Sequence, residues 1–183
     1  AGFAAPMILH DSVDERSMLI SSFSNKGIDD ELPKKRSHYG GATEDERYII
    51  LYIGEGGKKG NMLYIKDTQH PERGFIPVIT EFGHQVGIIE SVGENIYIQT
   101  NMDADKSKIV VTTITNPTPK NWRPLIPEKK DVLENAAIVD GKLITTYMKD
   151  ASHHVYIYNL NGILRNEVTL PSIGSVGGFA GKK

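Results

Sequence analysis

The sequence predicts an all-β protein that is built from repeated units of four short strands. No window longer than two helical turns places apolar residues at the i, i+3, i+4 and i+7 positions of an amphipathic helix. Short runs rich in β-branched and aromatic residues recur instead, separated by turns that use many of the 18 glycines and nine prolines. These runs repeat at a nearly fixed spacing, which a β-sandwich does not require.

The clearest pair of strands lies between His38 and Asp67. An apolar segment at residues 48–53, YIILYI, is followed by a glycine- and lysine-rich stretch at residues 54–60 and a second apolar segment at residues 62–65. Two such segments joined by a glycine-containing loop predict a β-hairpin. Since this loop is longer than a tight turn, we expect it to carry function.

The hairpin recurs twice further along the chain. Its first strand has counterparts that begin at residues 96 and 143, and its second strand has counterparts that begin at residues 108 and 154. Four short strands that recur every ~40–50 residues are typical of the blades of a β-propeller. We therefore expect blades at about residues 37–82, 83–130 and 131–172, with the start of another at residues 173–183. Residues 1–36 are either part of a preceding blade or a loose terminal segment.

Composition excludes several classes of protein. The chain of 183 residues is 39% hydrophobic and 24% charged, as in ordinary globular proteins, and its net charge of −2 argues against binding to nucleic acid or an anionic membrane. No apolar run approaches the ~20 residues of a membrane span. The first residues do not resemble a signal peptide, and the absence of cysteine leaves cytoplasm and periplasm both open.

We find no catalytic or metal-binding motif in the sequence. The Gly54–Gly60 stretch lacks Walker spacing and is followed by a strand, so a solvated loop is the better interpretation. Ser175 lacks the first glycine of a G-x-S-x-G motif, and the six histidines show no metal-ligand spacing. His153 and His154 alternate across a strand and cannot chelate one ion. We expect no cofactor, no metal site and no catalytic residue in this chain.

Three stretches contain motifs in a distinctive order. They are DELPKKRSHYGGATEDERYIILYIGEG at residues 30–56, the segment from Asn116-Pro117 to Pro127–Glu134, and IGSVGGFAG at residues 173–181. Together they resemble the N-terminal β-propeller of the prolyl oligopeptidase family of serine peptidases. The resemblance implies about three four-stranded antiparallel blades of an expected seven. It implies that the parent protein is a serine-type prolyl endopeptidase, which cleaves short peptides after proline. The Ser-Asp-His triad would lie on a C-terminal α/β-hydrolase domain of the same parent chain, and the propeller would act as a size filter.

The resemblance also implies two positions that touch substrate. In the family, the residue before the Gly-Gly pair and the residue after the x-E-G motif line the substrate pocket, and here these are Tyr39 and Gly57. Tyr39 would supply a flat apolar wall with a polar tip, and Gly57 would leave space. The alternative for Tyr39 is that it packs between blades.

For the chain as a whole, the alternative is a stand-alone propeller that acts as a protein-interaction scaffold. We expect the isolated fragment to self-associate, because an arc of blades leaves two sheet faces uncovered.

Overall fold

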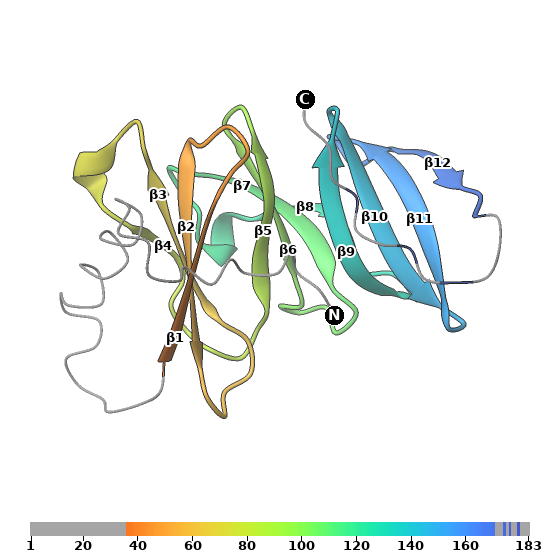
Figure 1. The fold of residues 1–183 in the computed structure, drawn as a ribbon, viewed down its shortest axis with the longest axis horizontal. Coiled ribbons are helices and arrows are strands. Elements are labelled where there is room, and N and C mark those ends of the chain that lie inside the picture. The colour runs from red at the N-terminus through yellow and green to blue at the C-terminus, as the bar shows by residue number, and fades with distance from the viewer. Residues whose placement is uncertain (1–35, 171–173, 175, 177–178, 180–183) are drawn as a thin grey trace. The chain divides into compact units, whose positions relative to one another are not determined.

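The computed structural model describes residues 36–170 together with Gly174, Val176 and Phe179. Three four-stranded antiparallel sheets account for nearly all of the secondary structure, and in each of them consecutive strands are neighbours (Figure 1). This confirms the predicted all-β class and the three four-stranded units. The helices among the described residues are two short 3-10 turns, η1 (Pro71–Arg73) and η2 (Pro119–Asn121). None of the helices in this described part is long and apolar enough to cross a membrane.

The chain divides into two compact units, and the first ends at Gln85. It contains one sheet, whose strands are β1 (Arg36–Ala42), β2 (Tyr48–Glu55), β3 (Met62–Asp67) and β4 (Ile76–Ile79).

The pairing of β1 with β2 extends further at its open end than the sequence predicts. The apolar pattern predicts a loop from Gly54 onward, but β2 continues through Glu55, and β1 begins opposite it at Arg36. Arg36 lies opposite Glu55 in the register, so this polar pair extends the ladder beyond the apolar residues. Cross-strand pairing outweighs the low strand propensity of Gly54 and Glu55.

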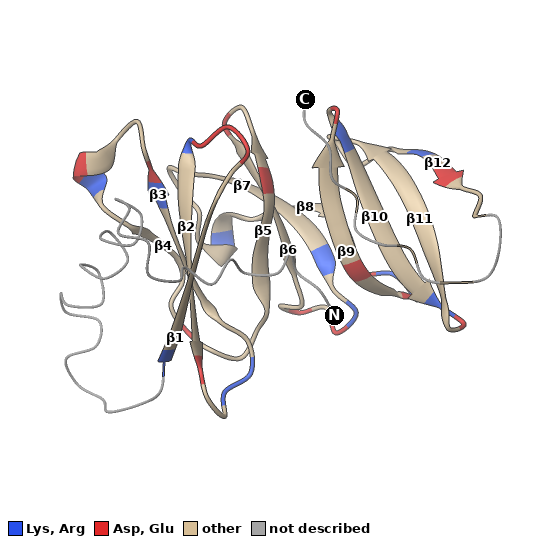
Figure 2. Cartoon of the chain, in the orientation of Figure 1, with Lys and Arg blue, Asp and Glu red and all other residues tan. Residues whose placement is uncertain are grey.

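Both faces of the first sheet carry buried apolar residues. On one face Leu51 and Ile53 are fully buried, and Tyr64 packs with them. On the other face Leu63 and Ile65 are also fully buried. Burial on both faces indicates a sheet that is covered on both sides, and not a sheet with one face in solvent. Figure 2 shows charged residues gathered mainly at turns and strand ends, which fits this burial.

The second compact unit begins at Val86 and contains the other two sheets. The strands of the second sheet are β5 (Val86–Val92), β6 (Asn95–Thr100), β7 (Lys108–Thr113) and β8 (Arg123–Ile126). The strands of the third sheet are β9 (Val132–Val139), β10 (Lys142–Lys149), β11 (Ser152–Asn159) and β12 (Leu164–Val168).

The second and third sheets share one apolar core. Tyr97, Ile109 and Ile126 of the second sheet pack with Leu143 and Tyr147 of the third, and all five are almost completely buried. A polar contact accompanies this packing, since the buried Gln99 side chain donates from Nε2 to the Leu133 carbonyl at 3.2 Å. The sheets therefore stack face to face, as expected for neighbouring blades of a propeller.

Lys129, in the segment that connects these two sheets, contacts three tyrosine rings of the third sheet. The Lys129 ammonium lies over the rings of Tyr147, Tyr156 and Tyr158, at 4.8, 4.7 and 5.1 Å from their centroids, and donates a hydrogen bond to the Tyr158 hydroxyl. Burial is the main cause that raises the pKa of Tyr147 above its ordinary value of 10.0. Cation–π contacts with several rings stabilise a partly desolvated ammonium.

The last strand of each sheet pairs irregularly with its neighbour. A register shift separates Leu63 from Tyr64 where β3 meets β4, and comparable shifts occur where β7 meets β8 and where β11 meets β12. Pro77 and Pro124 lie in the outer strands β4 and β8. Proline tolerates such edge positions because its missing N–H faces away from the ladder, and bulges increase the local twist.

Candidate functional site

The loop between β2 and β3, residues 56–61, lies at one end of the first sheet. It is fixed by backbone hydrogen bonds to the segment that follows β4: the Gly83 N–H donates to the Lys59 carbonyl at 2.8 Å, and the Asn61 N–H donates to the His84 carbonyl at 3.0 Å. Gly60 has a φ of +75°, and a Cβ at this position would lie 2.0 Å from the His84 carbonyl oxygen. The loop therefore requires glycine at residue 60.

Gly57 differs from Gly60 in its surroundings. Its φ of +85° also favours glycine, but a Cβ added to it would meet no atom within 4 Å. The residue is exposed at the tip of a loop whose base is held in place. A side chain at residue 57 would therefore extend into solvent.

A buried carboxylate organises the charges beside this loop. The Glu55 side chain is 3% exposed and lies 3.2 Å from Nε of Arg36 and 3.1 Å from Nζ of Lys58. The Lys58 ammonium also lies over the Phe82 ring, 4.8 Å from its centroid. Two cations around one carboxylate give the loop base a net positive charge and hold Lys58 near the tip.

Tyr39 lies within β1 rather than at the loop. It is half-buried and faces Tyr52 across the ladder, three positions along β1 from the Arg36–Glu55 pair. At ~3.3 Å per residue, Tyr39 is about 10 Å along the strand from the end of the sheet that carries Gly57. Tyr39 also points to the face opposite Arg36, because alternate residues of a strand face opposite sides. The two predicted site residues thus share one sheet but do not form a compact pair.

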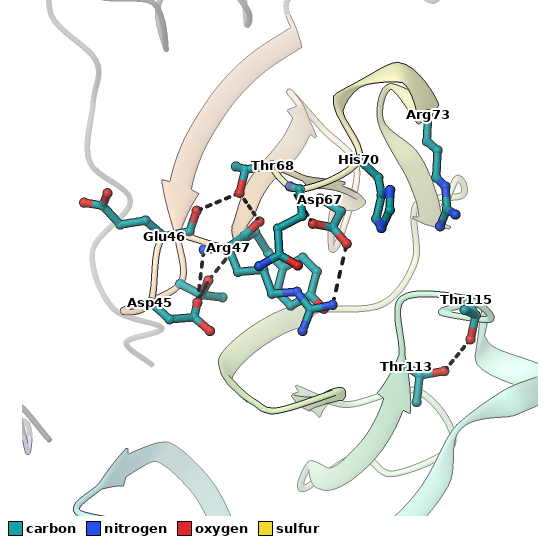
Figure 3. Close-up of polar contacts among 12 residues, drawn as sticks. Asp45, Glu46, Arg47, Asp67, Thr68, His70, Arg73, Thr113 and Thr115 are labelled. Atoms are coloured by element: carbon teal, nitrogen blue, oxygen red, sulfur yellow. Dashed lines mark hydrogen bonds and ion pairs between the residues drawn. The ribbon is translucent and has the colours of Figure 1, made fainter.

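Sequence reasoning missed a buried ion pair at the other end of the first sheet (Figure 3). Residues 45–47 form a charged turn, which the sequence alone predicts to be solvated. Asp45 and Glu46 are exposed, but the Arg47 side chain is only 17% exposed. Asp45 Oδ1 accepts hydrogen bonds from the Thr43 hydroxyl at 2.6 Å and from the Arg47 N–H at 3.1 Å. The Arg47 guanidinium lies 3.7 Å from Oδ2 of Asp67, which is 1% exposed, and the Thr68 hydroxyl donates to the Arg47 carbonyl at 2.9 Å. These contacts tie two loops together and indicate a structural role.

The adjacent histidines of β11 have separate acidic partners. Nε2 of His153 lies 2.8 Å from Glu134, and its Nδ1 accepts a hydrogen bond from the Val176 N–H at 2.8 Å. Nδ1 of His154 lies 2.9 Å from Glu167. Among the described residues no group of three or more His, Cys, Asp or Glu side chains is arranged to hold a metal ion. Ser175, considered above as a nucleophile, lies outside the described residues.

Three four-stranded meanders, with a fixed glycine-rich loop at the end of one of them, define the chain as part of a β-propeller. Residues 30–183 match the family described as "Prolyl oligopeptidase, N-terminal beta-propeller domain". The chain belongs to this family.

Two relatives that are named prolyl endopeptidases are consistent with this family assignment. The chain is 33% identical over 183 residues to a prolyl endopeptidase of Elizabethkingia miricola and 35% identical over 183 residues to one of Elizabethkingia meningoseptica. In both cases the alignment covers 96% of this chain and 25% of the relative. The chain thus spans about a quarter of the length of these curated relatives.

Solved structures show the same fold. One from a study of two prolyl endopeptidases and the role of inter-domain dynamics superposes with a TM-score of 0.70 at 27% identity, covering 79% of this chain and 21% of that one. Prolyl oligopeptidase B from Galerina marginata, bound to a 35mer hydrolysis and macrocyclization substrate, superposes with a TM-score of 0.68 at 23% identity, covering 76% of this chain and 20% of that one.

Proposed function

We propose that this chain is the non-catalytic propeller portion of a serine-type prolyl endopeptidase that cleaves short peptides after proline. In this proposal the propeller restricts the size of substrates, and its partner is a C-terminal α/β-hydrolase domain of the same polypeptide that carries the catalytic triad. Support comes from the membership of residues 30–183 in the propeller family and from relatives that are named prolyl endopeptidases. Blades at residues 37–82, 83–130 and 131–172 remain part of this proposal.

The Gly57 loop supports the substrate-facing role most directly. Its backbone is fixed to residues 83 and 84, its tip offers open space, and a buried carboxylate with two cations lies at its base. A substrate peptide that reached both Gly57 and Tyr39 would extend along β1 for about 10 Å, the length of about three extended residues. Tyr39 would contact an apolar part of the peptide through its ring.

Kinetics of the intact polypeptide that contains these residues test this role. Tyr39→Ala is expected to raise KM for a short proline-containing peptide by about ten- to a hundredfold with little change in kcat, because removing a buried aromatic contact costs about 1.5–3 kcal/mol. Tyr39→Phe keeps the ring and should restore a KM near that of the unmodified protein. If Tyr39→Ala lowers only the melting temperature and leaves KM unchanged, Tyr39 packs between blades and the proposed contact is wrong.

A substitution at Gly57 tests the second position. Gly57→Asn adds a side chain to the open space in a backbone conformation that asparagine tolerates better than other residues, so it should raise KM severalfold without unfolding the loop. Gly141→Asn is the matched control, since Gly141 has a φ of +65° and a Cβ added there would also meet no atom within 4 Å. Equal kinetic effects of the two substitutions would remove Gly57 from the proposed pocket. An intact polypeptide without any peptidase activity would favour the scaffold alternative.

A further inference from the structure

A cleft lies between strands of the second sheet and the turn that follows β11 in the third sheet. It consists of two adjoining cavities of about 390 and 260 Å³, both lined by Asn95, Tyr97, Leu160 and Asn161. The larger volume falls at the small end of the range of about 300–1,000 Å³ that is usual for ligand sites, and the smaller volume lies just below it. The cleft lies wholly within the second compact unit, and neither Tyr39 nor Gly57 contributes to it.

The rim of the cleft is held in a fixed shape. The Tyr97 hydroxyl donates to the Leu160 carbonyl at 3.2 Å, and Oδ1 of Asn159 accepts from the Ile163 N–H at 2.8 Å. The turn between β11 and β12 also presses against β8, since a Cβ on Gly162 would lie 2.6 Å from the Leu125 carbonyl oxygen. A ligand would therefore meet a preformed surface and not a loose turn.

Arg123 gives the cleft a positive charge. It lines the smaller cavity, and none of the described residues that line either cavity is Asp or Glu. Within the described part of the chain, the Arg123 guanidinium has no ion-pair or hydrogen-bond partner. Its charge reaches the cleft wall, because it opposes the rise that burial causes in the pKa of Tyr97.

The remaining lining offers amides and apolar walls. The side-chain amides of Asn95 and Asn161 make no hydrogen bond to another residue in the part of the chain that the structure describes. Each can therefore both donate to and accept from a ligand. Val111 and Leu125 supply apolar surface in the smaller cavity, beside Arg123.

We propose that this cleft binds the C-terminal end of a short peptide, with the terminal carboxylate on Arg123 and the last side chain against Val111 and Leu125. A guanidinium pairs with a carboxylate through two parallel hydrogen bonds, which an amide terminus does not permit. Asn95 and Asn161 match the backbone carbonyl and N–H groups of the residues that precede the carboxylate. This proposal does not depend on the peptidase function proposed above.

Fluorescence anisotropy of the intact polypeptide tests the proposal. The probe is fluorescein-labelled Gly-Ala-Leu with a free C-terminus, which lacks proline so that a proline-directed active site does not dominate binding. Arg123→Gln is expected to weaken binding about tenfold, the loss that corresponds to one charge-assisted contact. Arg165→Gln is the matched control, because Arg165 is an exposed arginine on β12 outside the cleft, and it should leave binding unchanged. Equal melting temperatures of the two variants show that both are folded.

Two further ligands make the result decisive. The same peptide with an amidated C-terminus should bind about tenfold more weakly to the unmodified protein and should lose nothing further in Arg123→Gln. Asn161→Ala should weaken binding of the peptide with a free C-terminus. The simple acid 4-methylpentanoate has the carboxylate and the apolar group but no backbone amides, so it should compete poorly with this peptide. Equal binding of acid and amide, equal binding to Arg123→Gln and unmodified protein, or strong competition by the simple acid would each overturn the proposal.

Discussion

Gly60 and Gly57 allow a direct test of the loop that supports the proposed substrate-facing role. Both have positive φ, so alanine at either position costs about 1–2 kcal/mol of backbone strain. At Gly57 the new methyl group meets no atom, whereas at Gly60 it would lie 2.0 Å from the His84 carbonyl oxygen. The loop must then move away from His84, which removes hydrogen bonds made by Asn61 and Gly83, each worth about 1 kcal/mol. Gly60→Ala should therefore cost about 2 kcal/mol more than Gly57→Ala.

Hydrogen exchange of the backbone amides in the intact polypeptide measures this difference locally. A difference of about 2 kcal/mol corresponds to about 30-fold faster exchange of the Asn61 and Gly83 amides in Gly60→Ala than in Gly57→Ala. Amides of β10 in the second compact unit serve as an internal control and should exchange equally in both variants. Equal protection of Asn61 and Gly83 in the two variants would refute the close approach of the loop to His84.

Three further predictions concern other parts of the chain. Glu55→Gln should destabilise the end of the first sheet by about 2 kcal/mol, because the partly buried Arg36 loses its carboxylate partner. Exchange of the β1 amides measures this loss, and Glu81→Gln, at an exposed position, should have no effect. The contribution of Tyr147 to the free energy of unfolding should be constant below pH 10 and fall as the pH rises further, since unfolding releases Tyr147 from the environment that raises its pKa. Tyr147→Phe should reduce this fall, which is at most about 1.4 kcal/mol per pH unit for one proton, and an unchanged slope would contradict the assignment to Tyr147. The isolated 183-residue chain should self-associate in sedimentation velocity, and a strictly monomeric chain that unfolds cooperatively would contradict this.

Local sequence patterns predict the inner strands of each sheet well. Residues 96–100 and 108–112 are rich in β-branched side chains, and the structure has β6 at Asn95–Thr100 and β7 at Lys108–Thr113. Such runs combine high strand propensity with burial on both faces, so propensity and packing favour the same structure. The spacing of 46–48 residues between equivalent strands also predicts that the four-stranded sheet repeats along the chain.

Features that depend on partners distant in sequence were not predicted. The extension of β1 and β2 depends on Arg36 facing Glu55, and both residues are unfavourable or neutral in strands when considered alone. The burial of Asp67 was missed because its cation, Arg47, belongs to another loop. One signal was available, since Asp67 ends a strand whose alternation places it opposite the buried Tyr48. A carboxylate in such a row requires a partner.

For the candidate site, the sequence predicts only two positions, and it does so through the resemblance to the family. The sequence suggests Tyr39 and Gly57, but the spacing along the strand between them follows from the register, which places Tyr39 opposite Tyr52 and Arg36 opposite Glu55. The cleft beside Arg123 has no sequence signal, because its lining comes from three strands of the second sheet and from the turn between β11 and β12 of the third. Residues that converge only through stacking of sheets carry no periodic pattern of their own.

Cleavage of matched substrates by the intact polypeptide tests the central proposal most directly. One substrate is an octapeptide with a single internal proline, and the other is the same octapeptide inserted in an exposed loop of a stable folded protein. We expect cleavage after proline in the free peptide, little or no cleavage in the folded protein, and no cleavage of either by the isolated 183-residue chain. Equal cleavage of both substrates would contradict the size filter. No cleavage of the free octapeptide by the intact polypeptide would contradict the proposed peptidase.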